Sequence, residues 1–224
     1  MRDIPITALK ALKVRYPGSM SEDFVYLASA SPRRRQLLAQ IGVPFQLLAV
    51  DVDETAAPGE GPEAYVRRVS AAKAATGWAA PLRRLPAAVL AADTAVVLGG
   101  QILLKPAGVE DGMRMLLDLS GRTHEVLTAI TLATARGLQS RLSRSEVTFR
   151  AISRSEARAY WETGEPRDKA GGYAIQGRAA VFVADLKGSH SGVMGLPLFE
   201  TAALLESEGV PRWRSPQAGG PHAH

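Results

Sequence analysis

The chain has 224 residues, of which 46% are hydrophobic and 22% charged, values typical of globular domains that bury a substantial core. It contains no cysteine, which excludes disulfides, thiolate zinc sites and a cysteine nucleophile. No apolar run approaches the roughly 20 residues of a transmembrane helix, and the N-terminus lacks the apolar segment of a signal peptide. We therefore expect a cytoplasmic protein with no membrane partner.

The formal net charge of +5 is concentrated at the two ends of the chain. Residues 1–22 and 211–224 each carry +2, which leaves +1 for residues 23–210. Because the central part is nearly balanced, bulk basicity is a weak argument for nucleic-acid binding. We predict an N-terminal extension (1–22), one domain (23–210) and a C-terminal tail (211–224), with no nucleic-acid partner.

The start of the domain predicts a strand, a tight loop and a helix. Residues 24–28 are an apolar run of strand type, Ser31 suits a helix N-cap, and Pro32 suits the first helical turn. Residues 33–35 are all arginine, at a helix end where the dipole disfavours cations. A bound polyanion would explain them, because backbone N–H groups and guanidinium forks converge there on phosphate oxygens. A solvated helix start is the alternative.

Apolar patterns then alternate between strands and helices, with turn residues between them. A capping box at residues 153–156 marks one helix start, and Gly77 and Gly164 are expected just past helix ends. The expected strands are residues 43–50, 87–98, 101–104, 124–135, 138–151 and 178–185. The expected helices are residues 62–76, 109–119, 153–161 and 197–208.

Two charged residues lie within apolar patterns. Lys73 shares a helical stripe with apolar residues, which fits either a snorkelling lysine or a ligand-binding one. Asp93 is the only charge in residues 87–98, and its burial would cost several kcal/mol unless it is paired or faces a wet cleft with a metal. We favour a functional role, because other charged residues also need inward partners. These are Asp53, Glu54, Lys73 and Lys105.

Residues 165–177 form a polar, glycine-rich loop in which the backbone can approach a ligand closely. Tyr173 could stack on a base, and Gln176 offers both a donor and an acceptor to a polar base edge. A floppy connector is the alternative. His124 has no histidine or cysteine partner nearby, so a structural or surface role is favoured over metal ligation.

These features describe a cleft suited to a nucleoside triphosphate with a divalent ion. The sequence also resembles the Maf family of nucleotide pyrophosphatases, which has an inosine-triphosphatase-like fold. The likeness covers about residues 24–209. The segments that carry it are residues 27–34, 53–54, 73, 92–94, 105–106, 119–124, 169–177 and 195–198.

The resemblance implies an α/β fold in which a mixed twisted sheet with flanking helices forms two lobes around a cleft. It implies hydrolysis between the α and β phosphates of a nucleoside triphosphate, helped by Mg²⁺ or Mn²⁺. It favours dTTP and UTP, includes removal of non-standard nucleotides as a further role, and links Arg33, Thr94 and Gln176 with substrate choice. Gly172 and Ala174 depart from the commoner loop sequence, which leaves fine base selectivity open.

In the expected mechanism, Glu54 and Asp93 hold the divalent cation, and Asp93 orients or deprotonates the attacking water. Basic side chains hold the triphosphate and offset the charge that grows on the pyrophosphate leaving group. The expected substrate contacts are Ser29, Arg33, Arg34, Lys73, Thr94, Lys105 and Gln176.

Three alternatives stay open. One is a non-catalytic nucleotide sensor that regulates cell division, and another is a nucleic-acid-binding module that uses the basic ends of the chain. The third keeps the enzyme but changes the substrate to 7-methyl-GTP or another modified nucleotide. A homodimer is a candidate assembly.

Overall fold

The computed structural model describes residues 24–83 and 85–213. The predicted extension (1–22) and nearly all of the predicted tail (211–224) lie outside these residues. Within the described ranges, no helix is long and apolar enough to cross a membrane.

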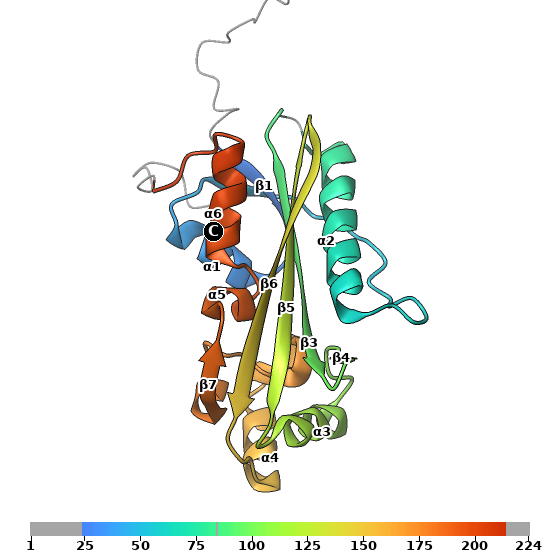
Figure 1. The fold of residues 1–224 in the computed structure, drawn as a ribbon, viewed down its shortest axis with the longest axis vertical. Coiled ribbons are helices and arrows are strands. Elements are labelled where there is room, and N and C mark those ends of the chain that lie inside the picture. The colour runs from blue at the N-terminus through green and yellow to red at the C-terminus, as the bar shows by residue number, and fades with distance from the viewer. Residues whose placement is uncertain (1–23, 84, 214–224) are drawn as a thin grey trace, which may run out of the picture.

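A seven-stranded mixed sheet forms the centre of the molecule, in the order β2-β1-β3-β5-β6-β7, with β4 also paired to β3 (Figure 1). Strand β1 pairs in parallel with β2 and β3, and the other pairs are antiparallel. The predicted mixed α/β fold is therefore confirmed. The strands are β1 (Val25–Ala28), β2 (Phe45–Leu47), β3 (Val89–Leu98), β4 (Gln101–Leu103), β5 (Thr123–Thr134), β6 (Gly137–Phe149) and β7 (Val183–Lys187).

Six α-helices and three short 3₁₀ segments accompany the sheet in the described residues. The α-helices are α1 (Pro32–Gln40), α2 (Pro62–Ala79), α3 (Val109–Leu119), α4 (Arg154–Glu162), α5 (His190–Met194) and α6 (Leu198–Ser207). The 3₁₀ segments are η1 (Glu165–Asp168), η2 (Ala170–Gly172) and η3 (Arg178–Phe182). The capping box is present, since the Ser153 hydroxyl accepts from the Glu156 N–H while the Glu156 carboxylate accepts from the Ser153 N–H.

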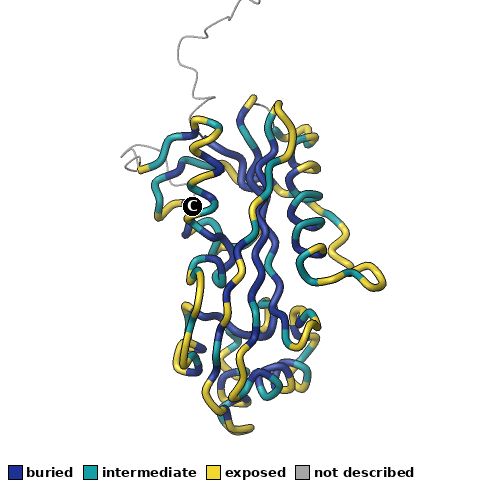
Figure 2. The backbone as a smooth tube through the Cα atoms, in the orientation of Figure 1, coloured by how far each residue is buried: buried dark blue, intermediate teal, exposed yellow. Residues whose placement is uncertain are grey.

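Helices cover both faces of the upper part of the sheet in Figure 1, with α2 on one face and α1 and α6 on the other. Side chains of β3 alternate between these two layers, as strand geometry requires. Leu90 and Ala92 pack with α1 and α6, whereas Val89 and Ala91 pack on the side of α2. Figure 2 shows the central strands buried along most of their length.

The strands β3, β5 and β6 continue into a second apolar cluster, which they form with α3 and α4 (Figure 1). Aromatic side chains dominate this cluster, among them Phe149, Tyr160 and Phe182. The sheet thus carries two lobes, one around each set of helices, as the resemblance implied.

An interruption along one edge of β3 lies between the two lobes. Strand β1 pairs with β3 only as far as Ala91, and β4 pairs with it only from Val96 onward. Among the described residues, positions 92–95 of β3 therefore have no strand partner on that edge. Asp93, Thr94 and Ala95 of this stretch line the space between the lobes.

Three predicted elements have clearly different bounds in the structure. The strand expected at residues 43–50 is limited to β2 (Phe45–Leu47). Helix α2 continues to Ala79 instead of ending before Gly77. Gly77 is buried against the sheet, where an added Cβ would lie 2.8 Å from Val89 Cγ1, so glycine serves close packing and not helix termination. The predicted strand at 178–185 begins only at Val183, because the Glu165 carboxylate accepts hydrogen bonds from the backbone N–H groups of Arg178 and Ala179 and fixes a 3₁₀ turn.

Gly77→Val is expected to lower the free energy of unfolding by about 1–3 kcal/mol, because extra methyl groups at a close-packed position force the sheet and helix apart. Chemical denaturation would measure the change. Ala75→Val is the matched control, because Ala75 is exposed on the same helix and carries only the propensity cost of a β-branched residue. Equal losses in the two variants would contradict the packing explanation.

Candidate active site

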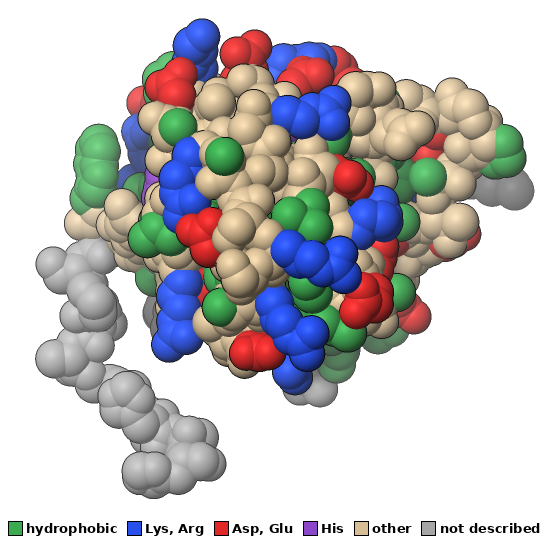
Figure 3. Space-filling view, turned by 90° about the horizontal axis from the view of Figure 1, so that it is seen from below, with side chains coloured by type: hydrophobic (Ala, Val, Ile, Leu, Met, Phe, Trp, Pro, Cys, Tyr) green, Lys and Arg blue, Asp and Glu red, His purple; other side chains and the backbone are tan. Residues whose placement is uncertain are grey.

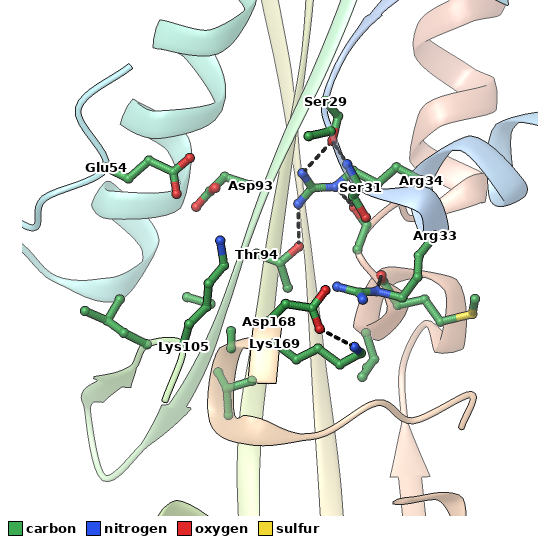
Figure 4. A pocket seen from close by; sticks show the side chains of 18 of the residues that line it. Ser29, Ser31, Arg33, Arg34, Glu54, Asp93, Thr94, Lys105, Asp168 and Lys169 are labelled. Atoms are coloured by element: carbon green, nitrogen blue, oxygen red, sulfur yellow. Dashed lines mark hydrogen bonds and ion pairs between the residues drawn. The ribbon is translucent and has the colours of Figure 1, made fainter. Parts of the chain in front are cut away.

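A cleft of about 760 Å³ lies at the interruption along β3. Both lobes contribute to its walls, and Figure 4 shows side chains from the turn after β1, from α1, from β3 and from the end of η1 facing one another across it. All nine residues predicted for the site line this cleft. They are Ser29, Arg33, Arg34, Glu54, Lys73, Asp93, Thr94, Lys105 and Gln176.

Strand β3 places Asp93 and Thr94 side by side in sequence but on opposite faces of the sheet. Asp93 contacts Lys73 from α2, while Thr94 contacts Arg34 from α1. The break in strand pairing makes both side chains part of one cleft. A ligand there can therefore touch groups from both helical layers.

Lys73 bridges the two acidic residues of the cleft. Its Nζ lies 2.9 Å from Asp93 Oδ1 and 2.7 Å from Glu54 Oε1. The exposed fractions of the Lys73 and Asp93 side chains are 12% and 8%, whereas that of Glu54 is 48%. Asp93 is therefore largely buried in the cleft wall and not in a fully water-filled groove, whereas Glu54 faces solvent.

Burial raises the pKa of Asp93, although the charges of Lys73 and Arg34 oppose this shift. For Glu54, partial burial raises the pKa, but the hydrogen bond and charge of Lys73 and the charges of Lys105 and Arg34 together leave it below its ordinary value. The two carboxylates therefore differ in basicity, with Asp93 the better proton acceptor of the pair.

Arg34 connects three segments of the cleft wall. Its Nη1 donates to Ser29 Oγ at 3.1 Å, its Nη2 to Thr94 Oγ1 at 3.2 Å, and its Nε to the Gly195 carbonyl at 2.7 Å. By contrast, the neighbouring Arg33 donates only from Nε, to the Met194 carbonyl at 3.3 Å, among the described residues. Arg34 therefore shapes the cleft, while the outer N–H groups of Arg33 remain able to bind an anion.

The N-terminus of α1 differs in detail from the prediction. Ser31 is the N-cap residue, but its hydroxyl makes no capping hydrogen bond, and the residue lines the cleft instead. Asp53, expected to find an inward partner, is exposed and accepts a hydrogen bond from the Thr55 N–H at 2.8 Å. Of the acidic pair at 53–54, only Glu54 belongs to the cleft.

The glycine-rich loop is anchored in the second lobe. Tyr173 is buried, its hydroxyl lies 2.8 Å from His124 Nε2, and its ring packs edge-on against Phe149. Burial lowers the pKa of His124 to about 4. His124 is therefore a structural residue, as expected, and the hydroxyl of Tyr173 serves to fix the loop that carries the exposed Gln176.

Three further cleft residues were missed from the sequence, namely Tyr65, Asp168 and Lys169. The Tyr65 hydroxyl donates to the Glu54 carbonyl at 2.9 Å, and its pKa is raised to about 12, first by burial and then by the charges of Asp93 and Glu54. Lys169 stands in the matched segment 169–177, so that segment was the available signal.

The acidic residues suit a cation that is bound together with a phosphate ligand. Asp93 Oδ2 is buried without a hydrogen-bond partner, and Glu54 presents its carboxylate to the same part of the cleft. In the described part of the chain, no group of three or more histidine, cysteine, aspartate or glutamate side chains could hold a metal alone. Mg²⁺ is commonly held by one or two carboxylates and substrate phosphates, which fits this donor set.

The fold and cleft define an α/β protein that can take an anionic ligand between two lobes. The profile of the family described as "Maf-like protein" matches residues 24–208, and the chain belongs to this family. The predicted resemblance is confirmed.

Curated relatives are similar over most of the chain. A protein of Saccharophagus degradans named "dTTP/UTP pyrophosphatase" is 54% identical over 201 residues, covering 88% of this chain and 94% of its own. Proteins of the same name from Aromatoleum aromaticum and Methylococcus capsulatus are 54% and 55% identical, covering 84% and 82% of this chain and 96% and 90% of their own. The solved structure of the Staphylococcus aureus Ham1 protein is a distant likeness, with a TM-score of 0.44 and 16% identity over 83% of this chain and all of the other.

Proposed function

We propose that this protein hydrolyses dTTP and UTP to the nucleoside monophosphate and pyrophosphate. The observation that carries the proposal is the cluster of Glu54, Lys73 and Asp93 in one cleft with the arginines of α1. The relatives named dTTP/UTP pyrophosphatase support the choice of substrate. We place the reaction in the cytoplasm, with a nucleotide as the ligand and a homodimer as the candidate assembly.

The charges of the cleft support triphosphate binding. Five basic and three acidic side chains line it, so it carries a net positive charge. Arg33 and Lys105 have donors that are not used by other described residues, and both face the cleft in Figure 4. We assign Arg33, Lys73, Lys105 and Ser29 to the triphosphate, where basic groups would stabilise charge on the departing pyrophosphate. Arg34 would hold Ser29 and Thr94 in place and add its positive charge to the same part of the cleft.

Asp93 is our candidate for the base. Its pKa is raised by burial, and a carboxylate with a raised pKa takes a proton from water more readily than an ordinary one. The neighbouring Thr94 lies on the other face of β3 and is held by Arg34. This contact fixes the backbone of the short stretch from which Asp93 projects, and so fixes the orientation of Asp93. Asp93 would orient the water and accept its proton as the oxygen attacks phosphorus.

Glu54 and Asp93 are the residues that would hold Mg²⁺ or Mn²⁺. Such a cation supplies positive charge next to the phosphate oxygens and lowers the cost of charge build-up there. Asp93 Oδ2, buried without a partner, is the protein atom that supports this assignment.

Gln176 is assigned to the nucleobase, and the family resemblance also links Arg33 and Thr94 with substrate choice. Gln176→Ala is expected to change the preference among dTTP, UTP, dCTP and dGTP more than it changes turnover of the best substrate, because an amide reads a polar edge and takes no part in bond cleavage. Ratios of kcat/KM across these nucleotides would measure the effect. Gln46→Ala on strand β2 is the matched control, and an unchanged substrate profile in Gln176→Ala would exclude the assignment.

The test of the proposed function is release of pyrophosphate and monophosphate from a panel of nucleoside triphosphates with Mg²⁺ and with Mn²⁺. The proposal expects dTTP and UTP to be the best substrates. Preference for 7-methyl-GTP or another modified nucleotide would keep the reaction and replace the substrate. Binding without pyrophosphate release would support a nucleotide sensor.

The nucleic-acid alternative makes a separate prediction of steeply salt-dependent duplex binding. Basic and acidic side chains are interspersed on the face shown in Figure 3, which does not favour a polynucleotide surface there. Duplex binding that depends on residues 1–22 and 211–224 would revive that alternative.

A further inference from the structure

The loop after α4 brings an additional ion pair into the cleft. Lys169 Nζ lies 2.5 Å from Asp168 Oδ1, and both residues line the cleft opposite α1. The exposed fraction of the Lys169 side chain is 13%, whereas that of Asp168 is 68%. The lysine is therefore held in the wall, and the carboxylate projects from it.

The backbone around Lys169 is fixed by close packing. Gly171 follows it with φ of +67°, and a Cβ at Gly171 would meet Val96 of β3 at 2.8–3.0 Å. The Gly171 N–H donates to the Leu104 carbonyl, and the Lys169 N–H donates to the Pro166 carbonyl, at 3.2 Å each. Lys169 therefore projects from a well-defined turn that is packed directly on the strand that carries Asp93.

Arg33 approaches the same carboxylate from the other lobe. In Figure 4 the Arg33 guanidinium extends toward one end of the Asp168 carboxylate, while Lys169 is paired with the other. Burial raises the pKa of Asp168, but the hydrogen bond and charge of Lys169 and the charge of Arg33 leave it below its ordinary value. Asp168 thus lies between two cations that belong to different lobes.

We propose that Asp168 is an internal counter-anion occupying a phosphate position between Arg33 and Lys169, and that Lys169 binds the phosphate chain when Asp168 is displaced. The exposed Asp168 side chain can turn out into solvent, while the enclosed Lys169 side chain stays in the wall. The inference rests on the proposed function only in taking a nucleoside triphosphate as the ligand.

The proposal predicts opposite effects for two neighbouring residues. Asp168→Asn removes the competing carboxylate, so inorganic triphosphate should bind about 2- to 5-fold more tightly, the range that a partly exposed ion pair allows. Lys169→Met removes a charge-assisted contact, so the same probe should bind about 10-fold more weakly or worse. If Asp168 served only to hold Lys169 in place, Asp168→Asn would instead weaken binding.

Titration calorimetry with inorganic triphosphate on the full chain tests the proposal, with the dTTP and UTP turnover of each variant measured in parallel. Asp118→Asn is the matched control for the change in net charge, because Asp118 pairs with Arg114 on the surface of α3 and does not line the cleft. Tighter binding in Asp168→Asn alone supports the proposal. Equal or weaker binding in Asp168→Asn, an equal gain in Asp118→Asn, or unchanged binding in Lys169→Met overturns it.

This design separates the two proposals. If the wild-type chain releases no pyrophosphate from dTTP or UTP but the variants shift triphosphate affinity as predicted, the proposed function fails and the phosphate position stands. If turnover is present but Asp168→Asn does not tighten the binding of inorganic triphosphate, only the proposal that Asp168 is a counter-anion fails.

Discussion

Asp93→Asn is expected to lower the turnover of dTTP and UTP by about 10²–10⁴-fold, the range for loss of a general base. The amide keeps the size of the side chain and the contact with Lys73, but it cannot accept a proton from water at neutral pH. Pyrophosphate release under saturating nucleotide would measure the loss, and calorimetric titration would show whether the nucleotide still binds.

The stability of Asp93→Asn provides the control for this prediction. Burial raises the pKa of Asp93 in the folded chain above its value in the unfolded chain, so at neutral pH the ionised form is less favourable in the folded state. Replacing it by a neutral amide should leave the melting temperature unchanged or higher. Near-normal turnover, or a loss of turnover that tracks a loss of folded protein, would contradict the role of Asp93.

Lys73→Met is expected to lower both activity and stability. Removing the ammonium leaves the enclosed Asp93 carboxylate without its partner, a change that costs about 3–5 kcal/mol at neutral pH for a buried pair. The loss depends on pH in a defined direction. Without Lys73 the pKa of Asp93 in the folded chain rises further. A raised pKa favours the folded state fully at pH values below the ordinary aspartate pKa of 3.8, and this contribution to the free energy of unfolding is lost as the pH rises through the pKa of the folded state.

Denaturation of Lys73→Met should therefore show a smaller deficit at mildly acidic pH than at neutral pH. The double variant Lys73→Met, Asp93→Asn should regain most of the stability without regaining turnover, because no buried charge is left unpaired. Arg67→Met is the matched control on the same helix, where Arg67 forms a surface pair with Glu63 that contributes at most about 0.5 kcal/mol. A deficit in Lys73→Met that does not change with pH would contradict the pairing with Asp93.

Local patterns were sufficient to predict most of the elements that build the cleft. The helix at Val109–Leu119 was predicted to the residue, because its apolar stripe is closed by Ser120 and Gly121. The central strand was recognisable from an apolar run interrupted only by Asp93 and Thr94, and the capping box from Ser153 and Glu156. The grouping of nine charged and polar residues in one cleft followed from the family motifs, not from periodicity.

Long-range contacts account for what the sequence did not reveal. The 3₁₀ turn at Arg178–Phe182 depends on a carboxylate 13 residues upstream, which no local pattern encodes. Glycine is the residue type expected just past a helix end, yet tertiary packing keeps Gly77 inside the helix. The three hydrogen-bond partners of Arg34 come from separate segments of the chain. The different roles of Arg33 and Arg34 could therefore be recognised only from the three-dimensional structure.

Strands β3 and β5 pass without a break from one apolar cluster into the other, and β6 pairs with β5 along the whole length of β5. A hinge between the lobes would have to shear these continuous ladders, at the cost of many backbone hydrogen bonds at once. Adjustment to a nucleotide must therefore come from the segments and side chains that border the cleft, chiefly the mostly exposed residues 51–59 and the exposed side chain of Asp168. The spacing between the groups proposed to hold phosphate and the group proposed to read the base is accordingly set when the chain folds, before any ligand binds.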